Sequence, residues 1–259
     1  MNLVIDWGNS SLKTGWFRED KQIVTGHYPS VDALLAELDG ASPGQPAHVL
    51  VSSTSRPADE IRAGLSGLNS EIRILDAQTP VPIRKAYDTP HSLGTDRVAA
   101  AVGAASLFPD QACLVLDLGT CLTADFVDPD ATFQGGLISP GLRMRFRAMH
   151  EQTARLPLVE PPTDGHGLDW PELTAKNTRS AMLSGVVNGL AFEMNGLLDA
   201  YRQKWPDLVV VLCGGDASVF ESHLKPPIFA VPELVLVGLN RILRYNVENL
   251  HAHTPGTTN

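Results

Sequence analysis

Short apolar runs of strand length alternate along the chain with longer segments whose apolar residues recur at helical spacing. The runs that predict strands are residues 2–5, 48–52, 71–75, 114–116, 124–127, 135–138 and 208–212. The segments that predict helices are residues 32–38, 59–68, 94–107, 142–154, 178–204 and 233–249. Proline-rich loops separate some of them, at residues 79–90 and 157–171. This alternation predicts an α/β protein.

One pattern occurs twice. Residues 2–17 read NLVIDWGNSSLKTGWF, and residues 113–127 read CLVLDLGTCLTADFV. In each copy an apolar run ends in Asp, a glycine follows after one residue, and a second apolar-rich stretch begins, which predicts a strand, a tight turn and a returning strand. The repeated carboxylates, Asp6 and Asp117, lie about half a chain length apart, so the pattern indicates a duplicated lobe rather than a solenoid.

The two copies predict the domain organisation. We expect the lobes to meet near residues 106–111, with an N-terminal lobe of residues 1–108 and a C-terminal lobe of residues 109–249. The last ten residues, 250–259, have the composition of a flexible tail.

Each predicted turn carries chemistry suited to a phosphate. A glycine turn exposes backbone N–H groups, hydroxyls add donors, Lys13 adds positive charge, and Asp6 can hold Mg²⁺ directly or through water. For one copy alone, a polar hairpin turn explains the pattern equally well. The second copy favours a nucleotide site, because two such turns facing each other would form a cleft. Neither a Walker A loop nor a G-x-G-x-x-G motif after a strand occurs.

A second candidate is the run Gly94-Thr95-Asp96-Arg97 at the start of a predicted helix. Arg97 could bind an anion there while Asp96 accepts a proton. The alternative is a helix N-cap followed by a surface ion pair, and the residues alone leave both readings open.

Further strings make the resemblance to a known family specific. The paired Asp-x-Gly turns resemble the phosphate loops of the acetate-and-sugar-kinase, Hsp70 and actin superfamily. The strings YDTPHSLGTDR at 87–97, GGLISPG at 135–141 and KNT at 176–178 then resemble type III pantothenate kinases in order and spacing. The resemblance extends from about Met1 to Asn249.

The resemblance implies a fold and an activity. The fold is α/β, with two duplicated actin-like (ribonuclease H-like) lobes, each a mixed five-stranded sheet with flanking helices. The activity is ATP-dependent phosphorylation of pantothenate to 4'-phosphopantothenate, the first step of coenzyme A biosynthesis, by a homodimer. The rivals are an actin-like or Hsp70-like nucleotide switch and a catalytically idle regulatory homologue. Retention of Asp6, Asp96 and Asp117 argues against an idle protein.

The resemblance also implies roles for particular residues. Asp96 is the catalytic base, Asp117 ligates a monovalent cation (K⁺ or NH₄⁺), and Asp6 serves Mg²⁺. The ATP-binding residues are Asp6, Trp7, Gly8, Asn9, Ser10, Ser11, Leu12, Lys13 and Thr120. The pantothenate-binding residues are Tyr87, Gly94, Thr95, Asp96, Arg97 and Thr178. Taken singly, Tyr87 would more often be a packed ring and Thr178 a helix N-cap.

Other positions carry weaker expectations. The turn Gly214-Gly215 fits a place where adenine passes close to the backbone. Ser10, Trp7 and Cys121 depart from the residues most common in the family, although none of these changes removes a reacting group. Four arginines surround one predicted helix, where they form either a solvated face or part of a subunit contact. They are Arg143, Arg145, Arg147 and Arg155.

Composition excludes several classes of protein. The chain of 259 residues has 29 acidic and 20 basic side chains and a formal charge of −9, which disfavours non-specific nucleic-acid binding. No apolar stretch approaches the roughly 20 residues that span a bilayer, so we expect no membrane partner. Cys113, Cys121 and Cys213 lack metal-ligand spacing, which fits a reducing cytoplasm.

Overall fold

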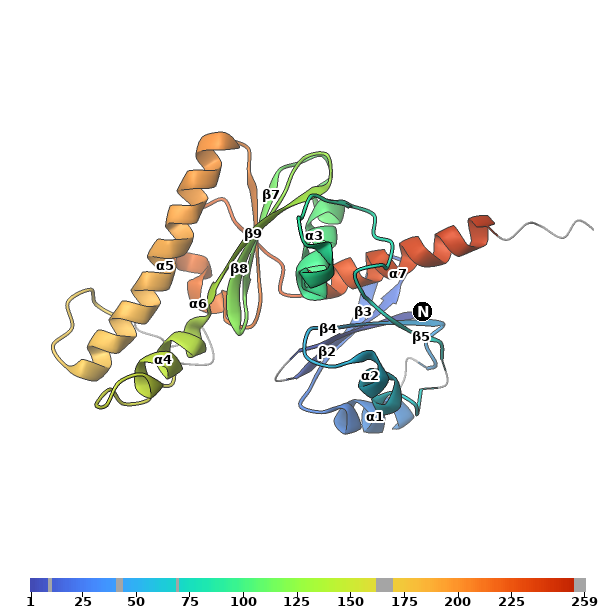
Figure 1. Ribbon diagram of the computed structural model, residues 1–259, viewed down its shortest axis with the longest axis horizontal. Helices are drawn as coiled ribbons and strands as arrows, with labels where there is room; N and C mark the ends of the chain where they lie inside the picture. The colour runs from blue at the N-terminus through green and yellow to red at the C-terminus, as the bar shows by residue number, and fades with distance from the viewer. Residues whose placement is uncertain (9–10, 41–43, 69, 162–169, 254–259) are drawn as a thin grey trace, which may run out of the picture. The chain divides into compact units, whose positions relative to one another are not determined.

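The computed structural model describes residues 1–8, 11–40, 44–68, 70–161 and 170–253 (Figure 1). The chain forms two compact units. The first contains Met1–Pro109, Ala131–Phe133 and Leu234–Asn259, and the second contains Asp110–Asp130 and Gln134–Glu233.

The first unit is built on a five-stranded mixed sheet of order β3-β2-β1-β4-β5. Its strands are β1 (Asn2–Trp7), β2 (Leu12–Arg18), β3 (Lys21–Tyr28), β4 (His48–Ser53) and β5 (Ile72–Ile74). Strand β1 pairs antiparallel with β2 and parallel with β4. It therefore lies at the centre of the sheet, where its carboxyl end carries Asp6.

Alternation along β1 assigns its side chains to two faces. Leu3, Ile5 and Trp7 are buried with residues of α1 (Val31–Gly40) and α2 (Ala58–Gly64), which lie side by side in Figure 1. The other face carries the helices α3 (Thr95–Leu107) and α7 (Leu234–His253). Asp6, which alternates with Ile5 and Trp7, is therefore on the face of α3 and α7.

Helices α3 and α7 approach each other so closely that glycine is required between them. A Cβ atom added to Gly238 would lie 1.8 Å from the carbonyl oxygen of Ala99, and one on Gly103 would lie 2.6 Å from that of Leu234. Both obstacles are backbone atoms, which cannot rotate away. This packing fixes α7 against α3, and α3 begins at the Gly-Thr-Asp-Arg run.

The closing helix thus differs from expectation. The sequence placed residues 233–249 in the C-terminal lobe, whereas α7 belongs to the first unit. Asn240 contributes to this packing, because its side chain donates to the Glu19 carbonyl at 2.8 Å and accepts from the Asn2 amide at 3.2 Å. Helix α7 also continues to His253, into the segment expected to be a tail, while residues 254–259 lie outside the described part of the chain.

The second sheet has six strands in the order β11-β10-β7-β8-β9-β6. They are β7 (Cys113–Leu118), β8 (Cys121–Val127), β9 (Thr132–Pro140), β10 (Val209–Cys213), β11 (Phe229–Ala230) and β6 (Arg84–Lys85). The order β9-β8-β7-β10-β11 repeats β3-β2-β1-β4-β5 strand for strand, which confirms the predicted duplication. The sixth strand, β6, pairs with Thr132 and Phe133 at the start of β9, which group with the first unit.

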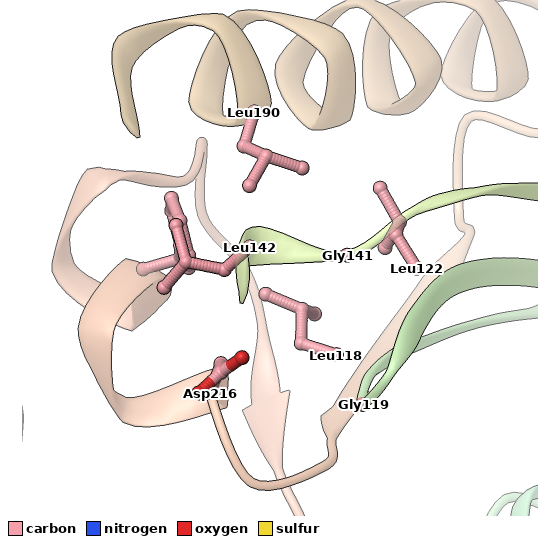
Figure 2. A pocket seen from close by; sticks show the side chains of 8 residues that line it. Leu118, Gly119, Leu122, Gly141, Leu142, Leu190 and Asp216 are labelled. Atoms are coloured by element: carbon pink, nitrogen blue, oxygen red, sulfur yellow. The ribbon is translucent and has the colours of Figure 1, made fainter. Parts of the chain in front are cut away.

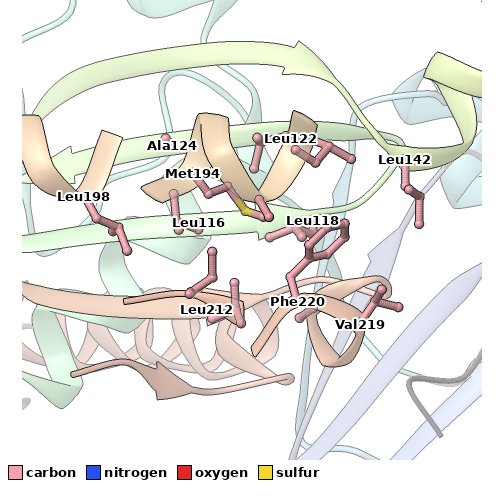
Figure 3. Packing of buried hydrophobic residues seen from close by; sticks show 14 of the residues in the cluster. Leu116, Leu118, Leu122, Ala124, Leu142, Met194, Leu198, Leu212, Val219 and Phe220 are labelled. Atoms are coloured by element: carbon pink, nitrogen blue, oxygen red, sulfur yellow. The ribbon is translucent and has the colours of Figure 1, made fainter. Parts of the chain in front are cut away.

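Helices cover one face of the second sheet. They are α4 (Leu142–Glu151), α5 (Thr178–Lys204) and the short α6 (Ala217–Phe220). Figure 3 shows their apolar side chains meeting those of β7, β8 and β10. The core residues labelled there include Leu116, Leu118, Ala124, Met194, Leu198 and Leu212. Because Leu116 and Leu118 face this core, Asp117 between them faces away from it.

Elements without an apolar pattern were not predicted. Strand β3 is an edge strand with mostly exposed side chains, so it lacks the alternation that reveals a half-buried strand. Strands β6 and β11 have two residues each, and the helical turns α6, Pro90–Ser92 and Glu221–His223 have three or four. Helix α2 also ends at Gly64, four residues before the predicted end. Within the described residues, no helix is both long and apolar enough to span a membrane.

Candidate active site

The first turn joins β1 to β2. Asp6 and Lys13 lie opposite each other in the antiparallel register, and the Gly8 N–H donates to the Ser11 carbonyl at 3.0 Å. The hydroxyl of Ser11 lies 2.7 Å from the Nε2 atom of His27 on β3. A carboxylate, a lysine and a glycine turn thus meet at one strand end, as predicted, while Asn9 and Ser10 lie outside the described residues.

Two residues predicted to bind ATP have buried side chains. Trp7 is 8% exposed and Leu12 is 2% exposed, and both pack in the core beneath α1 and α2. An open hollow of about 270 Å³ lies beside them and is also lined by Gly8 and Ser11. Because the side chains of Trp7 and Leu12 point to the face opposite Asp6, only the backbone of these residues is available to a ligand near Asp6.

Ser52 connects this turn to the Gly-Thr-Asp-Arg run. In the parallel pairing of β1 and β4, Ser52 is the register partner of Asp6. The Ser52 side chain is fully buried, and its hydroxyl lies 2.9 Å from the hydroxyl of Thr95 at the start of α3. Ser52 was not among the predicted site residues. Its position at the end of a predicted strand, like that of Asp6, was the available signal.

Replacing Ser52 with alanine tests this connection. The Ser52→Ala variant removes one hydrogen bond to Thr95, and such a bond typically contributes about 1 kcal/mol. We expect kcat/KM for the acceptor substrate to fall roughly three- to tenfold, because the start of α3 is held less well. Steady-state kinetics measure this change. Ser66→Ala, which removes an exposed hydroxyl bonded only to a nearby carbonyl, is the control and should match the wild type.

The Gly-Thr-Asp-Arg run forms the first turn of α3. Gly94 is the N-cap residue, and no side chain caps the helix. A Cβ atom on Gly94 would lie 2.5 Å from the Asp96 Oδ1 atom, so glycine leaves space for that carboxylate. The same oxygen accepts the Arg97 N–H at 2.8 Å. The start of the helix therefore orients Asp96. Asp96 is not the helix N-cap, which was the alternative interpretation of this run.

Arg97 is buried rather than at the surface. It is 7% exposed, and its guanidinium carbon lies 5.9 Å from the ring centroid of Tyr87 and 5.7 Å from that of Phe133. These distances permit cation–π contacts with both rings. Tyr87, a predicted site residue, is thus brought to Arg97. Phe133 was missed, since an aromatic residue in a strand is more often only part of a core.

The second turn joins β7 to β8. Asp117 lies opposite Thr123, and the Gly119 N–H donates to the Cys121 carbonyl at 3.0 Å. Three residues lie between the last paired residues of β7 and β8, whereas four lie between those of β1 and β2. The second turn is therefore one residue shorter than the first. Thr120 is exposed at the tip of the turn. The predicted carboxylate and hydroxyl therefore lie on the same hairpin.

The turn that follows β10 packs against Asp117. Gly214 has φ +93°, and a Cβ atom there would lie 2.5 Å from the Asp117 Oδ1 atom. Next to it, the Asp216 carboxylate accepts a hydrogen bond from Arg143 at 3.0 Å. Burial raises the pKa of Asp216, and the positive charge of Arg143 opposes that rise.

The cluster of arginines is partly engaged within the second unit. Arg143 pairs with Asp216, while Arg145 forms a short ion pair of 2.5 Å with Glu193 and donates to Ser139. Arg147 and Arg155 are exposed. The helix is therefore more than a solvated charged face.

Thr178 is the first residue of α5, in the second unit, and is exposed. Thr178 is not the N-cap of this helix. The N-cap is Asn177, whose side chain accepts the Ser180 N–H at 2.9 Å. Thr178 therefore has a hydroxyl that the helix start does not use as its cap.

The carboxylates of the described residues fit a nucleotide-borne metal better than a metal held by protein alone. No three His, Cys, Asp or Glu side chains gather into a metal site in that part of the chain. Mg²⁺ commonly binds one or two carboxylates together with substrate phosphates. Asp6, a hard oxygen donor beside Lys13 and a glycine turn, meets this requirement.

Comparisons with known proteins agree with this arrangement. The family model described as type III pantothenate kinase matches residues 2–200. The type III pantothenate kinase of Cytophaga hutchinsonii is 45% identical over 249 residues, which cover 95% of this chain and 100% of that protein.

Solved structures share the fold at low identity. A Campylobacter jejuni protein named for the Baf family of transcriptional activators has a TM-score of 0.59 at 18% identity, over 95% of this chain and 99% of that one. The ROK hexokinase of Thermus thermophilus has a TM-score of 0.52 at 15% identity, with the same coverage. These likenesses show a shared fold and nothing further. The match over most of the chain and the identity to full-length relatives establish that this chain belongs to the type III pantothenate kinase family.

Proposed function

We propose that this protein catalyses the ATP-dependent phosphorylation of pantothenate to 4'-phosphopantothenate. Within the first unit, the observation that carries the proposal is the connection through Ser52. The register of β1 and β4 and the bond to Thr95 bring a phosphate-type turn and the start of α3 together on one face of the sheet. A kinase needs a nucleotide turn and an acceptor-binding helix start in such proximity.

In the proposed reaction, Asp96 is the general base. The primary hydroxyl of pantothenate attacks the γ-phosphorus, a new O–P bond forms, and the bond from that phosphorus to the β,γ-bridging oxygen breaks, releasing ADP. Asp96 takes the hydroxyl proton. Phosphoryl transfer requires mainly alignment and charge stabilisation. The orientation of the Asp96 carboxylate by the Arg97 N–H supports this role.

We assign ATP-binding residues in each unit. Lys13 and the backbone amides near Gly8 stabilise the phosphates, and Thr120 contacts ATP from the second turn. Asp6 would hold a divalent ion on the nucleotide, directly or through water. When bound, this ion neutralises part of the negative charge of the phosphates. Trp7 and Leu12 contribute through their backbone, because their side chains are buried.

Pantothenate, which carries a carboxylate, is assigned to the start of α3. Gly94, Thr95, Asp96 and Tyr87 bind the acceptor within the first unit. Thr178 of the second unit is also assigned to pantothenate. Arg97 supplies the positive charge, and its position between two aromatic rings holds the guanidinium in one place. A fixed guanidinium binds a carboxylate with a smaller loss of side-chain entropy.

Three finer proposals complete the assignment. Asp117 ligates a monovalent cation, K⁺ or NH₄⁺, through its carboxylate. The protein acts as a homodimer, which the exposed apolar side chains Ile138 and Phe192, both more than 60% exposed, support. It acts in the cytoplasm, since all three cysteines are free thiols.

A coupled assay of ADP release tests the activity. Purified protein with ATP and Mg²⁺ should release ADP only when pantothenate is present, and the rate should be greatest when K⁺ replaces Na⁺. ATP hydrolysis that ignores pantothenate would instead indicate a nucleotide switch. An absence of turnover under all conditions would indicate an idle homologue, and equal rates in K⁺ and Na⁺ would remove the cation from Asp117.

A further inference from the structure

Two segments far apart in the sequence pack against the second turn, residues 117–121. At the start of α4, the Gly141 N–H donates to the Thr120 carbonyl at 3.2 Å. After β10, the Asp216 N–H donates to the Leu118 carbonyl at 3.0 Å. Both contacts are made by backbone, so the turn keeps its shape only while these two segments keep their places.

Glycines allow both segments to come this close. A Cβ atom on Gly141 would lie 2.5 Å from the carbonyl oxygens of Gly119 and Thr120. One on Gly214 would lie 2.5 Å from the backbone of Leu118. The turn is thus enclosed by backbone on two sides, and a small displacement of either segment is transmitted to it.

An ion pair joins the two segments to each other. Arg143, two residues after Gly141, donates from Nη1 to the Asp216 Oδ1 atom at 3.0 Å, although 73 positions separate the residues. Figure 2 shows the Asp216 carboxylate beside the apolar side chains of Leu118 and Leu142. The Asp216 side chain is only 10% exposed, whereas that of Arg143 is 46% exposed.

This asymmetry gives the pair an effect that most surface pairs lack. An exposed ion pair contributes little, because water solvates both charges when it breaks. Without Arg143, however, the Asp216 carboxylate would remain among leucines with its charge uncompensated. It would then be energetically favourable for the turn that contains Asp216 to move towards solvent and away from Leu118, because water would solvate the carboxylate.

We propose that the Arg143–Asp216 ion pair is a positioning clasp that holds the second turn in the shape that binds nucleotide. Neither side chain contacts the substrate in this proposal, so both are positioning residues. The inference rests on the proposed assignment of ATP to this turn. It gives the helix rich in arginines a role that neither a solvated face nor a subunit contact would supply.

Kinetics provide the first test, with Arg143→Ala, Asp216→Asn and the conservative Arg143→Lys. We expect Arg143→Ala to raise KM for ATP about five- to twentyfold, with KM for pantothenate within about twofold of the wild type. Asp216→Asn breaks the ion pair without leaving a buried charge, so it should raise KM for ATP by a smaller factor, about two- to fivefold. Arg143→Lys should recover most of the loss, because it keeps the charge. Lys225→Ala is the matched control. It breaks an ion pair of the same unit in which both side chains are about half exposed, and it should leave both KM values unchanged.

Thiol labelling provides a second test that does not need activity. Cys121 lies in the turn and is partly exposed, while Cys113 and Cys213 are buried. Burial raises the pKa of Cys113 to about 11, which further protects that thiol. In Arg143→Ala, Cys121 should react with a maleimide about fivefold faster, with the other two thiols still protected. Mass spectrometry of the digested protein locates the label.

Contrary outcomes are distinguishable. Unchanged KM for ATP and unchanged Cys121 labelling in Arg143→Ala would overturn the clasp, even if the melting temperature fell. If all three thiols of that variant react, it has unfolded, and Asp216→Asn decides the question by the same two measurements. If the wild type shows no turnover that depends on pantothenate, the proposed function fails, yet the labelling rates still test the clasp.

Discussion

Asp96→Asn should lower turnover by about 10²-fold or more while ATP binding persists. The amide has nearly the shape of the carboxylate and can still accept the Arg97 N–H, so the start of α3 should keep its conformation. It cannot take a proton from the pantothenate hydroxyl, and loss of a general base typically costs 10²- to 10⁴-fold. The coupled assay measures kcat, and titration calorimetry measures the affinity for ATP.

The matched control is Asp59→Asn. Asp59 is an exposed carboxylate in the first turn of α2, so this variant also removes one negative charge from an early helical position. Its kinetics should equal those of the wild type. If Asp96→Asn retained wild-type turnover, Asp96 would not be the base. If both variants lost activity equally, the cause would be the net charge rather than proton transfer.

Gly238→Ala should lower the stability of the protein strongly. Its Cβ atom would lie 1.8 Å from the carbonyl oxygen of Ala99 and 2.9 Å from the Gly103 nitrogen. Backbone atoms cannot rotate away, so α7 must separate from α3. Overpacking of this kind costs about 3 kcal/mol, or roughly 6–12 °C in melting temperature for a chain of this length. Differential scanning calorimetry measures the change.

Gly185→Ala is the control for this substitution. Gly185 is an exposed glycine within α5, and no atom lies within 4 Å of an added Cβ. Alanine has the higher helix propensity, so this variant should be more stable by about 0.5–1 kcal/mol. A Gly238→Ala protein that melts with the wild type would show that α3 and α7 do not need their close contact.

The sequence predicted the parts of the fold that have strong patterns. The duplicated Asp-x-Gly turns, the central strands β1 and β7 and the long helix α5 all follow from apolar runs and their punctuation. Confirmation of the family agrees with the strings at residues 87–97 and 135–141. The assignment of α7 failed, because nothing local in the sequence says which sheet an apolar helix face will cover.

The candidate site was predicted unevenly for a similar reason. Asp6 and Asp117 stand out because they recur in the duplicated Asp-x-Gly pattern, and Asp96 stands out because it lies in the string at residues 87–97. Ser52 and Phe133 do not stand out, since buried serines and aromatic residues occur in every core. Their importance comes from strand register and from the approach of distant segments, which only three-dimensional contacts show.

The placement of α7 has a consequence for synthesis of the protein. The first unit takes its last helix from residues 234–253, so it stays incomplete while the intervening 100 residues of the second unit, 134–233, are being made. During that interval the side of α3 that carries Gly103 has no partner helix in its own unit. A ribosome stalled before residue 234 would therefore hold a nascent chain with apolar surface still uncovered, the kind of chain on which chaperones act.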